Sequence, residues 1–474
     1  MTTTASTTLE PEAGEIDVSA RGPLLLLLGS AISWLVAGGV LALIASIQLH
    51  TPGFLTHCAW FTHGRMQAAQ ETALVYGWAI NAGLAVALWL LARLGGAPLR
   101  TPGLAFIGTI FWNLALTVGV IGIFLGDQTG FAFLQLPAYV QPIMLVAYAA
   151  IAVAGVLSWT GRRKAFTFAT HWYAVAALFV FPWVFSVAQV MLLFAPVHGT
   201  LQAVVATWFG QNLGALVLAP FALAAVYYLL PKISGRPVNH YDYAAHAFWV
   251  LLVIGGWAGG RHLIGGPVPA WVVTAGIIAS VLLLFHYVVV AVNLGGVFCA
   301  GGSTALRFSA IGLLAYLLGG ALNAVTSIRG VAQFTQFTFF SVAQTQLLLG
   351  GAFTFIIFGA IYFLAPRLAG KPWPSAKLIC AHFTAVLLGL VLNVGGLLVA
   401  GWIQGADLNQ ASVSFPTIAG HVHGWLLVAT AGQALMLLGS LALAFNFKWL
   451  LFVSVVQPAA GLFRTPAALE VPVP

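Results

Sequence analysis

Long apolar runs alternate with short polar stretches along almost the whole chain. Each run is long enough, and poor enough in charge, for an α-helix to cross the hydrocarbon core of a bilayer, which takes about 20 residues. Nothing in the pattern indicates strands. The sequence therefore predicts an all-α integral membrane protein. About twelve transmembrane helices are expected near residues 23–48, 68–94, 102–126, 134–158, 166–194, 200–230, 241–260, 270–298, 306–326, 337–366, 375–403 and 415–447.

One membrane bundle is expected to fill the chain. Its domain covers residues 23–450, between a polar tail at 1–22 and a C-terminal tail at 451–474. The spans are rich in Gly and Ala, which lets helix backbones approach closely in lipid. We find no soluble domain and no convincing internal repeat.

The basic residues predict the orientation of the bundle. With twelve spans, both termini and the even-numbered loops share one side of the membrane. Fourteen of the 17 Lys and Arg fall on that side: Arg21, Arg93, Arg100, Arg162, Arg163, Lys164, Lys232, Arg236, Arg307, Arg367, Lys371, Lys377, Lys448 and Arg464. Only Arg65, Arg261 and Arg329 fall on the other. The positive-inside rule then places both termini in the cytoplasm, so the net charge of +8 reflects topology and not nucleic-acid binding. Membrane lipids are expected partners, and no nucleic acid is.

Ionisable residues inside the spans are scarce. The mean hydropathy is +1.01; among acidic residues only Glu71 is well inside a predicted span, whereas Asp127, Asp242 and Asp407 are at span ends or in loops. A proton-pumping relay normally needs buried carboxylates, so this composition disfavours one. The three cysteines are far apart and form no C-x-x-C-H haem-attachment motif. We interpret them as small buried hydrophobic residues.

The polar residues that do occur within spans are the candidate functional groups. Four glutamines are prominent, at Gln70, Gln211, Gln344 and Gln346, and a membrane glutamine most often only hydrogen-bonds a neighbouring helix. "WAGGRHLIGGPVPAW" (257–271) also places Arg261 next to His262 at the end of an apolar segment.

Several phrases resemble subunit I of the haem–copper oxidases, the catalytic subunit of cytochrome c oxidase, and specifically its cbb-type branch. They are "TWFGQNLGALVLAPFALAAVYYLLPKISGRPV" (207–238), "WAGGRHLIGGPVPAWV" (257–272), "FTFIIFGAIYFLAPRLAGKPW" (353–373) and, more loosely, "FTHGRMQAAQETALVYGWAINA" (61–82). The resemblance extends over roughly residues 25–450 and agrees with a twelve-helix fold. It implies a bacterial-type inner membrane, a respiratory electron-transport complex with other subunits, and an oxygen-reducing activity in the family.

The family's chemistry needs six histidines, whose imidazoles hold two haems and one copper, and in addition a tyrosine. By the resemblance, the haem-ligand positions fall on Gln70, Gln344 and Gln346. The copper-ligand positions fall on Gln211, Arg261 and His262, and the tyrosine position falls on Gly255.

These substitutions argue against metal binding. A glutamine amide is a weak ligand for haem iron and a worse one for copper, and a guanidinium stays protonated beside a metal cation. Glutamine can still keep a buried hydrogen-bond network. We therefore expect that the protein binds no haem or copper and acts as a structural or assembly subunit and not as a catalyst. We also expect the substituted residues to converge on one region around the former cofactor cavity.

Two other interpretations remain open. "AGHVHGW" (419–425) resembles a haem-binding phrase, so His421 or His423 could hold haem b in a divergent cbb-type oxidase or nitric-oxide-reductase-like subunit. Alternatively, the vacated cavity could serve a channel or a protein that binds a lipid or small molecule. Four further intramembrane histidines are expected to be packing residues: His171, His246, His286 and His382.

Overall fold

A computed structural model describes residues 9–296 and 302–456, and no strand occurs in this part of the chain. The helical segments, in chain order, are α1 (Leu9–His50), η1 (Ala59–Phe61), α2 (His63–Thr72), η2 (Ala73–Ile80), α3 (Asn81–Gly95), α4 (Pro102–Leu125), α5 (Gln141–Thr160), α6 (Ala169–Gln189), η3 (Val190–Phe194), α7 (Thr200–Asn212), η4 (Leu213–Leu218), α8 (Ala219–Ser234), η5 (Tyr241–Tyr243), α9 (Ala244–Ile254), η6 (Gly255–Leu263), α10 (Ala270–Leu294), α11 (Thr304–Ser327), α12 (Arg329–Thr335), α13 (Phe339–Gln346), η8 (Leu347–Phe353), α14 (Thr354–Ala369), α15 (Ala376–Leu408), α16 (Phe415–Leu451) and η9 (Phe452–Val456).

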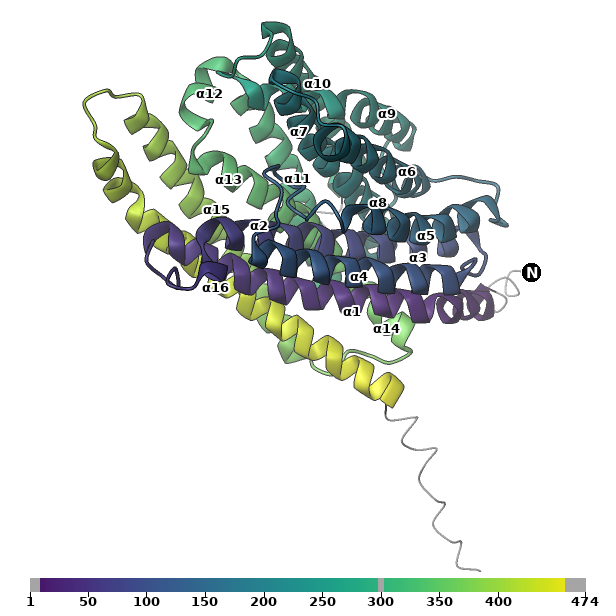
Figure 1. Cartoon of the computed structure of the whole chain (residues 1–474). Coiled ribbons are helices and arrows are strands. Elements are labelled where there is room, and N and C mark those ends of the chain that lie inside the picture. Colours follow the sequence, from purple (N-terminus) through teal and green to yellow (C-terminus); the bar gives the residue numbers. More distant parts are fainter. Residues whose placement is uncertain (1–8, 297–301, 457–474) are drawn as a thin grey trace, which may run out of the picture.

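Twelve helices in this described part are long and apolar enough to cross a membrane. The predicted number of spans and the all-α membrane fold are therefore confirmed. Several spans consist of consecutive segments, such as α2, η2 and α3, which together run from His63 to Gly95. The long helices lie side by side in one bundle (Figure 1).

Small residues allow the close helix contacts that the composition predicted. Helices α15 and α16 form the most extensive helix pair. A Cβ atom added to Gly389 of α15 would lie 2.7 Å from the carbonyl oxygen of Gly432 in α16. Only glycine permits this backbone approach, because any larger residue would separate the two helices.

The first helix starts earlier than the hydropathy pattern indicates. Helix α1 begins at Leu9, so most of the predicted polar tail at 1–22 belongs to the first helix. Asp17 accepts a hydrogen bond from Trp89 Nε1 at 2.8 Å and lies 3.8 Å from Arg93. These contacts give Asp17 partners in the neighbouring helix α3. Of the predicted C-terminal tail, residues 457–474 lie outside the described part.

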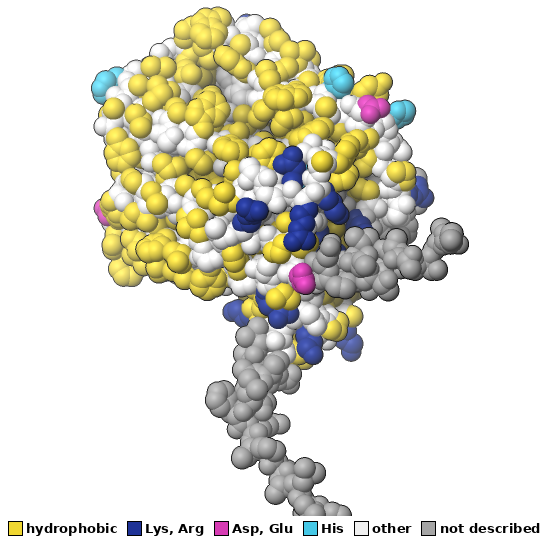
Figure 2. Space-filling model, turned by 90° about the vertical axis from the view of Figure 1, so that its right-hand side faces the viewer, with side chains coloured by type: hydrophobic (Ala, Val, Ile, Leu, Met, Phe, Trp, Pro, Cys, Tyr) yellow, Lys and Arg dark blue, Asp and Glu magenta, His cyan; other side chains and the backbone are white. Residues whose placement is uncertain are grey.

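Basic side chains gather at one end of the bundle. The beginning of α1 and the end of α16 lie at this same end (Figure 1). Figure 2 looks at that end and shows Lys and Arg side chains grouped on it, surrounded by an apolar periphery. The grouping of basic side chains predicted from the sequence is therefore visible at this end of the bundle.

Two local predictions differ from the structure. The fourth span begins at Gln141 and not near residue 134, because Pro137 cannot continue a helix and the preceding segment forms a loop. Cys58 and Cys380 are exposed and not buried. Cys380 lies on the outer surface of α15, where no other helix of the described bundle covers it. Cys299 lies outside the described residues.

Candidate functional site

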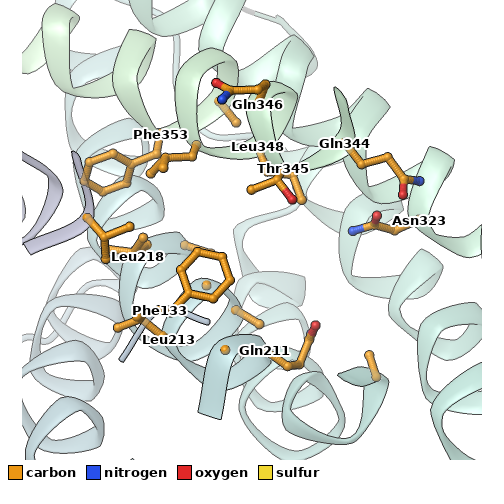
Figure 3. Close-up of a pocket in the computed structure, with 18 of the residues that line it drawn as sticks. Phe133, Gln211, Leu213, Leu218, Asn323, Gln344, Thr345, Gln346, Leu348 and Phe353 are labelled. Atoms are coloured by element: carbon orange, nitrogen blue, oxygen red, sulfur yellow. The ribbon is translucent and has the colours of Figure 1, made fainter. Parts of the chain in front are cut away.

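A cavity of about 540 Å³ lies inside the bundle. Its lining includes all six residues singled out from the sequence: Gln70, Gln211, Arg261, His262, Gln344 and Gln346. Figure 3 shows Gln211, Gln344 and Gln346 around this space. The predicted convergence of these residues is confirmed, although they lie on four different spans.

The glutamines come from the three most deeply buried spans, His63–Gly95, Thr200–Ser234 and Phe339–Ala369. In each span a π-helical segment begins shortly after the glutamine: η2 after Gln70, η4 after Gln211 and η8 after Gln346. Such π-helical insertions are rare and occur frequently at functional sites. All three π-helical segments contribute residues to the lining of the cavity.

Glycines position Arg261. The segment η6 carries four glycines in "GGWAGGRHL" and forms a tight 3₁₀ helix instead of an α-helix. A Cβ atom on Gly276 of α10 would lie 2.3 Å from the backbone nitrogen of Arg261. A Cβ atom on Gly259 would lie 2.7 Å from Cβ of Gln211. The glycines thus allow η6 to lie directly between α7 and α10.

Arg261 and Gln344 share one hydrogen-bond partner. Gln344 Nε2 donates to Thr326 Oγ1 at 2.7 Å, and Arg261 Nη1 donates to the same oxygen at 3.4 Å. Arg261 Nη2 donates to Asn323 Oδ1 at 3.1 Å. Arg261 is 8% exposed and Gln344 is 6% exposed. The cluster therefore links η6, α11 and α13 through neutral acceptors.

The remaining predicted residues have fewer partners. Gln211 Nε2 donates to the carbonyl oxygen of Gly255 at 3.0 Å. The backbone carbonyl of His262 accepts from Gln336 Nε2 at 2.9 Å. Within the described part of the chain, Gln70 Oε1 is buried without a hydrogen-bond partner.

The two sides of the cavity differ in polarity. Asn323 and Gln344 lie on one side, whereas Leu218, Phe353 and Phe133 lie on the other (Figure 3). Phe133 belongs to the loop before α5, and this loop enters the bundle. The backbone carbonyl of Phe133 accepts a hydrogen bond from the Tyr76 hydroxyl. The cavity is consequently amphipathic.

Sequence reasoning missed several lining residues. Glu71, Tyr287 and Asn323 all line the cavity, and the Glu71 carboxylate accepts a hydrogen bond from Gln135. The position of Glu71 directly after Gln70 in the sequence is a signal that could have identified it. Asn323 was detectable as a polar residue inside the apolar run of α11.

His421 and His423 lie away from the cavity. Both are exposed on α16. His421 Nδ1 lies 2.8 Å from Asp407 Oδ2, and the His423 ring is 5.9 Å from the His50 ring in an edge contact. The two histidines thus contact neighbouring outer segments, and neither lines the central space.

Three of the four histidines assigned to packing are buried. His286 contacts the Ala247 carbonyl at 2.8 Å and the Tyr316 hydroxyl at 2.9 Å. His382 Nδ1 lies 2.8 Å from the Tyr362 hydroxyl, and His171 Nδ1 accepts from the backbone of Phe168. His246, in contrast, is exposed on α9. The prediction holds for the first three.

The donor set of the cavity does not fit a haem–copper centre. The irons and the copper of a haem–copper centre are held by several imidazoles, and the lining offers the single imidazole of His262 beside amides, hydroxyls, the Glu71 carboxylate and a guanidinium. Within residues 9–296 and 302–456, no group of three or more His, Cys, Asp or Glu could hold a metal ion.

Comparisons with known proteins agree with this architecture. The family described as "Cytochrome C and Quinol oxidase polypeptide I" matches residues 23–435. A cytochrome c oxidase subunit 1 homolog of Azorhizobium caulinodans is 25% identical over 92% of this chain and 83% of its own length. The Cbb3-type cytochrome c oxidase subunit CcoN1 of Stutzerimonas stutzeri is 24% identical, over 88% and 91%.

A solved structure supports the fold itself. The cryo-EM structure of a heme-copper terminal oxidase dimer matches with a TM-score of 0.70, covering 95% of this chain and 86% of the other. The sequences are only 13% identical. This likeness therefore concerns the arrangement of the helices.

Proposed function

Because the chain belongs to the cytochrome c and quinol oxidase polypeptide I family, we propose that it is a subunit of a respiratory membrane complex that has lost its metal centres. In this proposal it holds neither haem nor copper at the family's positions and acts as a structural or assembly subunit. Other subunits of the complex are its partners. The active oxidase of the family would then be a different chain.

The observation that carries the proposal is the position of Arg261. Its guanidinium is buried beside His262, at the edge of the cavity, and hydrogen-bonds Asn323 and Thr326. A permanently protonated group repels a nearby metal cation and has no lone pair to offer it. The amides of Gln70, Gln211, Gln344 and Gln346 complete a lining that suits hydrogen bonding better than metal coordination.

The competing interpretation, haem b held by His421 or His423, receives no support from their positions. Residues i and i+2 of a helix point in widely different directions. Both side chains are exposed on α16 and do not line the cavity. Haem bound by either histidine is therefore the result that would overturn the proposal.

The charge distribution suggests the cellular orientation. The protein is a multi-pass membrane protein, and the bacterial inner membrane is the location that its family favours. We propose that the end rich in Lys and Arg faces the cytoplasm (Figure 2). The cavity residues Gln70, Arg261 and Gln344 then lie in the outer half of the bilayer.

An absorption spectrum of the purified full chain, with iron and copper analysis of the same sample, tests the proposal. We expect no Soret band and only trace metal. A haem-containing oxidase subunit expressed and purified in the same way shows that the host supplies cofactor. About one haem per chain would overturn the proposal, and the variants His421→Ala and His423→Ala would then show whether those histidines hold it.

A further inference from the structure

Arg261 is a buried cation without an acidic partner. Its two hydrogen-bond acceptors, Thr326 Oγ1 and Asn323 Oδ1, are both neutral. Within residues 9–296 and 302–456, no carboxylate lies at ion-pair distance from its guanidinium. A charge inside a membrane protein is strongly unfavourable unless a counter-charge or water accompanies it. The protein itself supplies no counter-charge here.

The guanidinium can be reached from the cavity. Arg261 lines it, and acceptors among the described residues use only two of the five N–H donors of its guanidinium. The Tyr287 hydroxyl and Asn323 Nδ2 also belong to lining residues, and neither donates to an acceptor within the described part of the chain. Several donors and one positive charge therefore converge on one side of the space.

The other side of the cavity is mainly apolar. Leu218 and Phe353 face the space there (Figure 3). The volume of about 540 Å³ falls within the range of about 300–1,000 Å³ that is usual for small-molecule sites. A small inorganic anion would leave the apolar wall uncovered, whereas a neutral apolar molecule would leave Arg261 without a counter-charge.

We propose that this cavity binds an amphipathic anion, namely an acyl chain that carries a carboxylate or phosphate head group. The head group pairs with Arg261 and accepts hydrogen bonds from Asn323 and Tyr287. The acyl chain lies along Leu218 and Phe353. Glu71 also lines the cavity, and its carboxylate accepts a hydrogen bond from Gln135. Because two anions repel each other, the head group lies at the Arg261 side and not beside Glu71. This inference rests on the proposed function, because copper at the position of Arg261 would exclude such a ligand.

Direct binding to the purified full chain in detergent tests the inference, with radiolabelled palmitate as the probe. Hexadecanol, which has the same chain length without the charge, should compete about tenfold to a hundredfold less well than unlabelled palmitate. Acetate should not compete at comparable concentration, because it lacks the apolar part. Competition by dioleoyl phosphatidic acid distinguishes a phospholipid head group from a free fatty acid as the preferred source.

Variants connect binding to the named residues. Arg261→Gln should weaken palmitate binding by about tenfold or more and abolish the preference over hexadecanol. Arg329→Gln is the matched control, because Arg329 lies at the same end of the bundle, hydrogen-bonds Thr274 and does not line the cavity. Leu218→Trp, which fills the apolar side, should weaken both ligands equally. Thermal unfolding of each variant verifies folding, and Leu218→Trp keeps the test valid if Arg261→Gln does not fold.

Three results would overturn the inference. They are equal binding by the wild type and Arg261→Gln, equal affinity for palmitate and hexadecanol, and an unchanged affinity in Leu218→Trp. Spectra of the same samples separate this failure from failure of the proposed function. A metal-free protein without the palmitate preference overturns only this inference, whereas a stoichiometric Soret band overturns both.

Discussion

Replacing Thr326 with valine tests whether the hydroxyl shared by Arg261 and Gln344 holds the polar cluster together. Valine has nearly the same shape as threonine but cannot accept a hydrogen bond. The change removes the 2.7 Å bond from Gln344 Nε2, the longer 3.4 Å bond from Arg261 Nη1, and the 2.9 Å bond that the hydroxyl donates to the Leu322 carbonyl of its own helix. Thr326 is 4% exposed, so water cannot easily replace the lost acceptor.

The magnitude follows from these distances. A neutral hydrogen bond contributes about 0.5–1.5 kcal/mol net, and side-chain bonds in membrane proteins average about 0.6 kcal/mol. The bond from Gln344 is short, whereas the bond from Arg261 is long and its guanidinium keeps Asn323 as an acceptor. We therefore expect Thr326→Val to lower the free energy of unfolding by about 1–2 kcal/mol.

Unfolding in mixed micelles with increasing sodium dodecyl sulfate, followed by circular dichroism, measures the change. Thr109→Val is the matched control, because Thr109 is equally buried but its hydroxyl only donates to the Ala105 carbonyl of its own helix. The double variant with Gln344→Met should show a coupling of about 1 kcal/mol between the two sites. Equal losses in Thr326→Val and Thr109→Val, or no coupling, would refute the reasoning.

Two further predictions concern topology and helix packing. Cys58 is exposed in the loop after α1 and should react with a membrane-impermeant maleimide in intact cells. A cysteine introduced as Lys371→Cys should react with it only after permeabilisation. The reverse pattern would contradict the proposed orientation. Gly276→Ala should lower the free energy of unfolding by about 1–3 kcal/mol, because its Cβ would lie 2.3 Å from the Arg261 backbone nitrogen. Gly395→Ala is the control, since a Cβ there meets nothing within 4 Å, and a loss of similar size in both variants would argue against the close contact of η6 with α10.

The resemblance to a known family anticipated which residues of distant spans meet, but not how they interact. It indicated that Gln70, Gln211 and Gln344 would surround one space, and the structure places them there. It did not indicate that Thr326 links Gln344 to Arg261. That contact depends on the rotation of α11 about its own axis, which neighbouring helices determine.

The sequence by itself determined the number of helices and the asymmetry of charge. In lipid, each backbone polar group must be satisfied within its own helix, so an apolar run of sufficient length specifies a spanning helix without reference to the rest of the fold. Hydropathy did not predict the early start of α1, because Asp17 makes the helix start look polar. Its partners, Trp89 and Arg93, come from another helix.

The tertiary structure alone decided how the cavity is divided and where the loop before α5 lies. Hydropathy treats every apolar residue alike, so it could not indicate that Phe133 enters the bundle while Cys380 remains on its outer surface. Nor could it reveal that Arg261, at the end of a span, is buried against Asn323 and Thr326. These features depend on contacts between helices, and helix packing is governed by side-chain shape at the interfaces, which hydropathy does not record.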